Sequence, residues 1–212
     1  MTHRFAIYYA PARDSALAER AEAWLGRPDL ETVTVSARRY GFHATLRAPM
    51  ALAVELAELD RTIAAFAATH APVALTGIAP RLLDGFVALT LKPQPQVVTE
   101  LAAEVVTAFE PFRGPLSPAE RARRFTAPLT PRQIELVETY GYPYVLEQFQ
   151  FHMTLSDWLA VEHRQRLQAE AEDWFADVLR TMPVLDRLVL FEEPEPGAPF
   201  RRLDDYPLMG AR

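Results

Sequence analysis

The sequence predicts an α+β fold built from a duplicated lobe, with antiparallel sheets and helices on their outer faces. Strand-like runs follow one another directly in several places and alternate with amphipathic helices elsewhere. Two segments with the pattern His-x-Thr-Leu, at His43 and His152, recur roughly 110 residues apart, which fits a duplicated lobe better than a solenoid. A helix-like segment begins about ten residues after each of these histidines. The order of elements therefore repeats along the chain.

The first half of the repeat covers roughly residues 1–95. Its first helix begins at a cap, Asp14 or Ser15, and ends at Gly26. The apolar face of that helix contains Leu17, Ala21, Trp24 and Leu25. In chain order, the other expected elements are a strand over residues 5–9, a loop that contains Arg38 and Arg39, a strand over 40–46, a helix over 54–69, and strands over 73–78 and 85–91.

The second half, residues 96–212, repeats this order without a clear opening strand and around an insert over about residues 111–144. Its expected elements are a helix over 96–109, a strand over 148–155, a helix over 161–179, and strands over 184–191 and 198–203. We therefore predict a single two-lobed domain over residues 1–212.

The insert contains two helix-start signals. Ser117 with Glu120, and Thr130 with Gln133, form capping boxes with proline at the first helical position, so two short helices are expected. Two interpretations of the insert stay open at this stage. It either covers a groove or serves as a packed connection.

Composition excludes several classes of function. The chain has 212 residues, a formal net charge of −6 and no cysteine. A net negative charge disfavours binding to long nucleic acids, and without cysteine there are no disulfides, thiolate ligands or thiol nucleophiles. No apolar run approaches the roughly 20 residues that span a bilayer, and the N-terminal residues lack a signal-peptide pattern. We expect a cytoplasmic protein that has no association with membranes.

Both His-x-Thr-Leu segments combine an apolar face with a polar one. Side chains alternate along a strand, so His43 and Thr45 share one face, and His152 and Thr154 share the equivalent face. One such histidine is more often structural, but two in equivalent places of a repeat favour a functional pair. Histidine titrates near neutral pH, so one imidazole can act as base and the other as acid on opposite sides of a phosphorus atom. The two threonine hydroxyls can then donate to the phosphate oxygens.

A metal site is the competing interpretation of the paired histidines. Catalytic metal sites of this kind usually add a carboxylate close to the histidines, whereas both motifs have threonine there. Asp157 follows the second motif only. The chain also lacks a Gly-x-Ser-x-Gly elbow, a Gly-rich phosphate loop and a dinucleotide fingerprint. We therefore expect no metal and no cofactor.

The motifs and several longer phrases resemble the two-histidine phosphoesterase superfamily, which includes RNA 2′,3′-cyclic phosphodiesterases. Five segments resemble more specifically a bacterial branch of this superfamily that is often encoded with phosphonate-degradation genes. They are residues 5–11, 24–27, 39–46, 141–144 and 151–155. The resemblance covers nearly the whole chain. It implies a bilobed fold with a central groove, catalytic roles for His43 and His152, and phosphate contacts from Thr45 and Thr154. It also implies a cyclic phosphodiester substrate, such as a ribose cyclic phosphate formed during phosphonate breakdown.

Other side chains have two interpretations each. Arg47 continues the alternation of His43 and Thr45, so it either reaches the phosphate or points outward; the resembled family more often has lysine there. Tyr8, Tyr40 and Tyr144 either stack on a sugar or base or are buried with a satisfied hydroxyl. The basic cluster in the insert either attracts an anionic substrate or forms a solvated helix face; it consists of Arg121, Arg123 and Arg124.

These observations favour a metal-independent phosphoesterase that acts on a small phosphorylated metabolite or nucleotide. Two other classes stay open: a module that binds a phosphorylated metabolite without converting it, and a structural partner in an enzyme complex. The acid-base residues in both motifs favour the enzyme, since a pure binding protein has no need of them.

Overall fold

Short antiparallel sheets form the centre of the protein. Its structure is a computed structural model that describes residues 3–211. The strands are β1 (Arg4–Tyr9), β2 (Ala44–Met50), β3 (Val73–Ala74), β4 (Ile78–Leu83), β5 (Phe86–Leu91), β6 (His152–Thr154), β7 (Val184–Leu185), β8 (Arg187–Glu193) and β9 (Arg201–Pro207). One sheet has the order β2-β1-β8-β9, a second has the order β4-β5-β6, and β3 pairs with β7. The pairings are antiparallel, so the predicted α+β class is confirmed.

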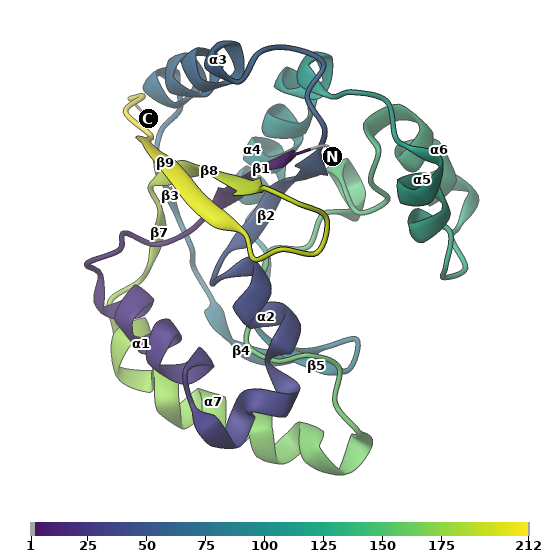
Figure 1. Cartoon of the computed structure of the whole chain (residues 1–212). Coiled ribbons are helices and arrows are strands. Elements are labelled where there is room, and N and C mark those ends of the chain that lie inside the picture. The colour runs from purple at the N-terminus through teal and green to yellow at the C-terminus, as the bar shows by residue number, and fades with distance from the viewer. Residues whose placement is uncertain (1–2, 212) are drawn as a thin grey trace.

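Helices cover the outer faces of the two larger sheets (Figure 1). The helices are α1 (Ala16–Leu25), α2 (Val35–Tyr40), α3 (Leu56–Thr69), α4 (Gln96–Ala108), α5 (Pro118–Arg124), α6 (Pro131–Tyr140) and α7 (Val161–Arg180), with short 3-10 helices η1 (Pro28–Val33), η2 (Glu110–Phe112) and η3 (Leu146–Gln148). In the four-stranded sheet, α3 packs against β8 and β9, and α4 packs against β2. In the three-stranded sheet, α7 packs against β4 and β5 and is flanked by α1.

Each of the two larger sheets contains strands from both halves of the sequence. β1 and β2 pair into one sheet with β8 and β9, whereas β6 joins β4 and β5. The sequence halves 1–95 and 96–212 therefore do not coincide with the two sheets. β2 and β6 are edge strands that contact each other, so the two His-x-Thr-Leu segments lie where the sheets meet.

Helix α1 shows how local signals and packing agree. Ser15 caps its first turn and Gly26 ends it, as predicted. Its buried residues are Leu17, Ala21, Trp24 and Leu25. The indole N–H of Trp24 donates to the carbonyl oxygen of Leu155 at 2.9 Å. Because Leu155 directly follows β6, this bond ties α1 to the second motif.

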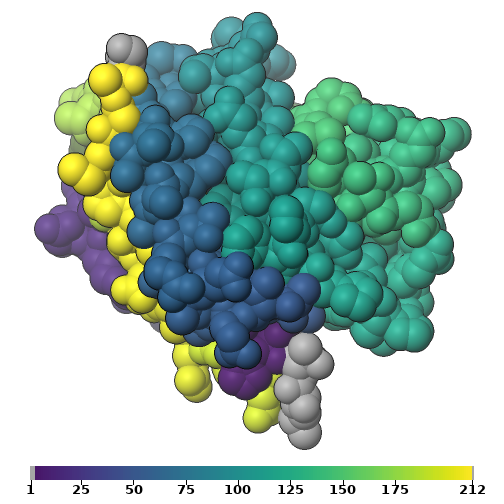
Figure 2. Space-filling view, turned by 90° about the horizontal axis from the view of Figure 1, so that it is seen from above, coloured from purple at the N-terminus to yellow at the C-terminus, as the bar shows by residue number. Residues whose placement is uncertain are grey.

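The insert forms two short helices, α5 and α6, as the sequence predicts. Both begin with the expected capping boxes, Ser117 with Glu120 and Thr130 with Gln133. The insert forms one flank of the molecule, and the C-terminal strand lies along the opposite flank (Figure 2). The last residues of the insert are followed closely in the chain by the second His-x-Thr-Leu motif.

Several local predictions are wrong. The strand predicted over residues 148–155 is reduced to His152–Thr154 and follows a 3-10 helix at Leu146–Gln148. Arg38 and Arg39 lie in helix α2 and not in a loop, because the Asp157 carboxylate accepts the Ser36 N–H in its first turn at 3.0 Å. The strand predicted over residues 73–78 is instead divided between β3 and β4, with Gly77 at a φ of 72° between them. A positive φ of this size is favourable only for glycine, so the chain turns there.

Within residues 3–211, no helix combines the length and apolar character that crossing a membrane requires.

Candidate active site

The two predicted histidines occupy equivalent positions beside the contact between the sheets. β2 begins at Ala44, so His43 lies one residue before the strand, whereas His152 is the first residue of β6. This corrects the strand predicted over residues 40–46. Residues 35–40 are helical, and Gly41, with a φ of 74°, turns the chain from α2 toward the strand.

Both imidazoles are held in the same orientation by the backbone. The Nδ1 atom of His43 lies 2.8 Å from the carbonyl oxygen of Gly41, and Nδ1 of His152 lies 2.8 Å from that of Gln150. A carbonyl oxygen only accepts hydrogen bonds, so Nδ1 carries the proton in each neutral ring. The lone pair is then on Nε2, which is the atom available to take or return a proton. Nε2 of His43 lies 3.3 Å from the Thr45 hydroxyl oxygen.

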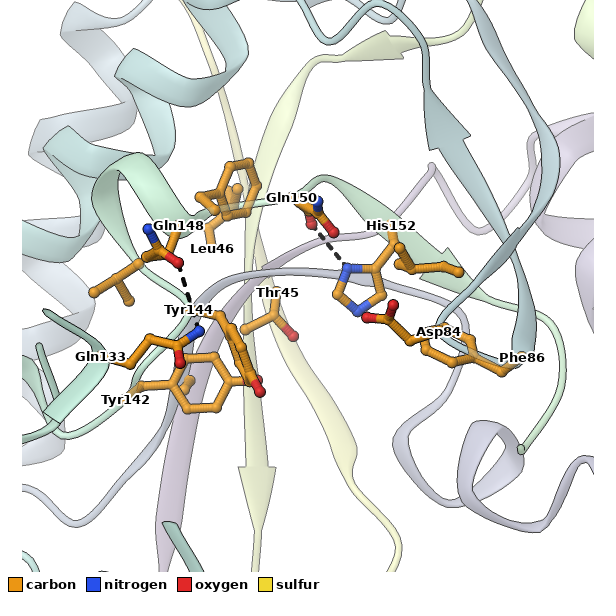
Figure 3. A pocket seen from close by; sticks show the side chains of 14 residues that line it. Thr45, Leu46, Asp84, Phe86, Gln133, Tyr142, Tyr144, Gln148, Gln150 and His152 are labelled. Atoms are coloured by element: carbon orange, nitrogen blue, oxygen red, sulfur yellow. Dashed lines mark hydrogen bonds between the residues drawn. The ribbon is translucent and has the colours of Figure 1, made fainter. Parts of the chain in front are cut away.

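Two neighbouring cavities contain the four motif side chains. The larger, of about 430 Å³, is lined by Thr45 and His152 among others (Figure 3). The smaller, of about 300 Å³, is lined by His43 and Thr154. Phe86 lines both cavities. Each cavity therefore combines the histidine of one motif with the threonine of the other, and the arrangement brings the four predicted residues into one region.

Burial disfavours the charged form of both imidazoles. The pKa of His43 is lowered to about 4, mainly by desolvation. A positive charge on His152 also lowers this pKa, whereas the bond to the Gly41 carbonyl raises it. Desolvation also lowers the pKa of His152, but the Gln150 carbonyl and the Asp84 carboxylate both act in the opposite direction. Asp84 lies beside the His152 ring (Figure 3). His152 is therefore the one of the two whose charged form has a nearby carboxylate.

The low pKa of His43 predicts a loss of stability in acid. The unfolded chain binds a proton at residue 43 near the ordinary value of 6.5, whereas the folded protein does so only near 4. The contribution of neutral His43 to the free energy of unfolding is therefore fully present above about pH 6.5. As the pH falls from 6.5 to 4, this contribution decreases by about 3 kcal/mol. Urea unfolding across that range should show a smaller acid loss in His43→Gln than in the unmodified protein. Equal losses in the two proteins would rule this origin out.

Arg47 does not line either cavity, contrary to its predicted contact with the phosphate. Thr45 pairs with Tyr8 of β1, but Arg47 pairs with Ile7, so β2 contains one extra residue at a bulge. A bulge interrupts the alternation of faces, and this one turns Arg47 away from the side of Thr45. The side chain is 2% exposed and forms an ion pair with Glu110 at 2.5 Å. It also donates to the carbonyl oxygen of Val106 at 3.4 Å.

The three predicted tyrosines lie at different depths. Tyr8 is buried and stacks on the His43 ring, with 3.9 Å between ring centroids, so it supports the imidazole and lines neither cavity. Tyr40 lines the smaller cavity beside His43. Tyr144 is half-exposed and lines the larger one. Tyr40 and Tyr144 are thus placed to contact a ligand, and Tyr8 is placed to hold His43.

Several lining residues were not predicted from the sequence. Asp84 and Gly85 form a two-residue hairpin loop between β4 and β5, both with positive φ, and this turn brings Asp84 to His152. The dipeptide Asp-Gly between two apolar runs is a hairpin signal that could have revealed it. The insert and the segment after it contribute Gln133, Tyr142, Gln148 and Gln150 to the larger cavity. No local signal points to these four, because their placement depends on how the insert packs.

Asp157 has a structural partner. Both of its carboxylate oxygens accept the backbone N–H of Ser36, at 3.0 and 3.2 Å. Among residues 3–211, no three His, Asp or Glu side chains gather in a group suited to hold a metal ion. The residues that meet in the cavities bring imidazoles, hydroxyls, amides and aromatic rings, together with the carboxylates of Asp84 and Asp157.

The chain is similar to one protein family and to several known proteins. The family described as "Protein of unknown function (DUF1045)" matches residues 45–201. Two curated relatives are named "Ribose 1,5-bisphosphate phosphokinase PhnN". The one from Janthinobacterium sp. (strain Marseille) is 35% identical, over 98% of this chain and 51% of the relative. The one from Laribacter hongkongensis (strain HLHK9) is 36% identical, over 93% of this chain and 50% of the relative. The chain spans about half the length of these relatives.

Similar solved structures include one described as a phosphoesterase, with a TM-score of 0.46 and 13% identity, over 97% of this chain and 98% of that one. Escherichia coli LigT with NADP+ is similar at a TM-score of 0.45 and 14% identity, over 98% of both chains. The protein ATU0111 from Agrobacterium tumefaciens is similar at a TM-score of 0.47 and 13% identity, over 96% of this chain and 85% of that one.

Proposed function

This chain belongs to the DUF1045 family of proteins of unknown function, and from its site we propose that it is a phosphoesterase that opens a small cyclic phosphodiester. The observation that carries the proposal is the matched pair of imidazoles. His43 and His152 both have Nδ1 bound to the carbonyl two residues earlier, so the lone pair is on Nε2 in each, and at His43 the Thr45 hydroxyl oxygen lies 3.3 Å from it. Each shares a cavity with the threonine of the other motif.

In the proposed reaction, Nε2 of His43 accepts a proton from a water molecule whose oxygen forms a bond to phosphorus. The bond from phosphorus to an ester oxygen breaks in line with the attack. Nε2 of protonated His152 gives a proton to that leaving oxygen, so the product is a phosphomonoester with a free hydroxyl. Asp84 and the anionic substrate both favour the charged form of His152, whereas the low pKa of His43 suits a base.

The threonines are suited to contact the reacting phosphate. Thr45 lines the larger cavity and Thr154 lines the smaller, so each strand offers a hydroxyl as donor. Hydrogen bonds to the non-bridging oxygens stabilise the charge that they hold in the transition state. The mechanism needs no metal ion and no cofactor.

A phosphorylated ribose is the substrate class that we favour. The two curated relatives are named for a kinase of ribose 1,5-bisphosphate, although this chain has no Gly-x-x-x-x-Gly-Lys phosphate loop and spans only half of them. Tyr40 and Tyr144 offer ring faces for a sugar or base at the two cavities. A ribose cyclic phosphate released in phosphonate breakdown, converted in the cytoplasm, fits this class.

The proposal is tested by phosphorus NMR with a chelator present. The panel contains 2′,3′-cyclic nucleotides, ADP-ribose cyclic phosphate and ribose 1,2-cyclic phosphates. At least one cyclic ester signal is expected to be replaced by that of a monoester. Binding without product, measured by calorimetry on the same compounds, would favour the non-catalytic binding module instead. No product and no binding across the panel would count against both.

A further inference from the structure

The two cavities contain no cationic side chain that could balance a phosphodiester. No Arg or Lys lines either cavity in the described part of the chain, and the charged residues that do are Asp84 in the larger and Asp157 in the smaller. In the proposed reaction His152 carries the proton that it gives to the leaving oxygen, but the described residues give the pair of cavities no permanently charged cation. Arg47 is buried on the far side of β2 and paired with Glu110. A singly charged phosphodiester therefore needs a cation from somewhere else.

Arg124, the last residue of α5, lies behind the wall of the larger cavity. Its guanidinium carbon is 4.8 Å from the centroid of the Tyr142 ring, and Tyr142 lines that cavity together with Thr45 and His152. Figure 3 shows the Tyr142 ring facing the space beside Thr45. A charge on Tyr142 is among the causes that raise the pKa of the buried Tyr8, which stacks on the His43 ring.

Unlike Arg121 on the same helix, Arg124 has no carboxylate partner. Arg121 forms an ion pair with Glu138, whereas Arg124 forms none with any residue in 3–211. The Nε atom of Arg124 is buried and has no hydrogen-bond partner among these residues. The guanidinium that stacks on Tyr142 thus has a buried donor without an acceptor among the described residues.

An unpaired, partly buried guanidinium is energetically unfavourable. Desolvation is the main cause that lowers the pKa of Arg124, and the positive charges of Arg4 and Arg123 lower it too, whereas Tyr142 and the Glu120 carboxylate act in the opposite direction. Burial of a charge without a partner costs free energy, and an anion bound nearby offsets that cost. The same environment strengthens a charge-assisted hydrogen bond to such an anion.

We propose that Arg124 binds the charged phosphate of the substrate, with the Tyr142 ring as the platform that holds the guanidinium at the cavity wall. The insert would then provide both the platform and the cation, a role that neither motif fills. This inference rests on the proposed phosphoesterase function for its kinetic test. Anion binding can be measured independently of turnover.

The test compares Arg124→Gln with Arg123→Gln. Arg123 is exposed on the same helix, so the two variants change the net charge equally and differ only in which side chain is lost. On the best substrate of the panel, Arg124→Gln is expected to raise KM roughly 10- to 100-fold while kcat changes much less, as loss of a charge-assisted hydrogen bond predicts. Arg123→Gln should leave KM within about twofold, because exposed charges have small effects. Arg124→Lys should recover part of the loss.

Calorimetry with inorganic phosphate separates this inference from the proposed function. Weaker phosphate binding by Arg124→Gln than by Arg123→Gln would support the role of Arg124 even if no substrate were turned over. Turnover by the unmodified protein, with equal KM and equal phosphate affinity in the two variants, would overturn it and leave the phosphoesterase proposal intact. Thermal melting of both variants checks that each is folded, and Arg124→Lys provides the readout if Arg124→Gln is not.

Discussion

Replacement of either His43 or His152 with alanine is expected to reduce kcat/KM by about 10²–10⁴-fold. Each variant loses one of the two groups that move a proton in the proposed reaction. The neighbouring threonines and the cavity walls are unchanged, so residual binding of the substrate should persist. Initial rates of ring opening, followed by phosphorus NMR at a fixed pH, give the comparison.

His163→Ala is the matched control for this prediction. His163 is exposed near the start of α7 and lines neither cavity, so its loss should leave the rate within about twofold. The double variant His43→Ala/His152→Ala should be only slightly slower than the worse single variant, since residues that act as a unit are not additive. Activity at the original level in both single variants would end the assignment of the two histidines.

Arg47→Ala is expected to lower the free energy of unfolding by about 3 kcal/mol without a change in KM. The Arg47 side chain is 2% exposed and donates to Glu110, to the Val106 carbonyl and to the sulfur of Met50. Its removal leaves the Val106 carbonyl without this donor, opens space in the core and leaves Glu110 with Arg113 alone. Urea unfolding gives the stability, and the NMR rate assay gives KM.

Arg132→Ala provides the comparison for a surface ion pair. Arg132 is half-exposed and pairs with Glu135 and Glu147, which are also half-exposed or more. Surface pairs of this kind contribute at most about 1 kcal/mol, so Arg132→Ala should unfold at nearly the original urea concentration. If Arg47→Ala raised KM strongly and kept its stability, Arg47 would be a substrate contact after all, as its spacing in the sequence suggested.

Local chemistry accounts for the elements that the sequence predicted well. Ser15 and Gly26 bound α1, and the capping boxes at Ser117 and Thr130 start α5 and α6. In each case the interactions that define the element lie within a few residues of it. Helix α2 was missed for the opposite reason, because the partner of its first turn, Asp157, is more than a hundred residues away in the chain.

The sequence by itself determined the α+β class and selected four polar side chains, His43, Thr45, His152 and Thr154, because short-range periodicity and a repeated motif specify both. The tertiary structure decided which residues share a cavity. The bulge in β2 turns Arg47 into the core, the hairpin at Asp84 delivers a carboxylate to His152, and the insert places Tyr142 against the groove. Strand register and the packing of distant segments set these positions, and alternation along one strand contains no information about either.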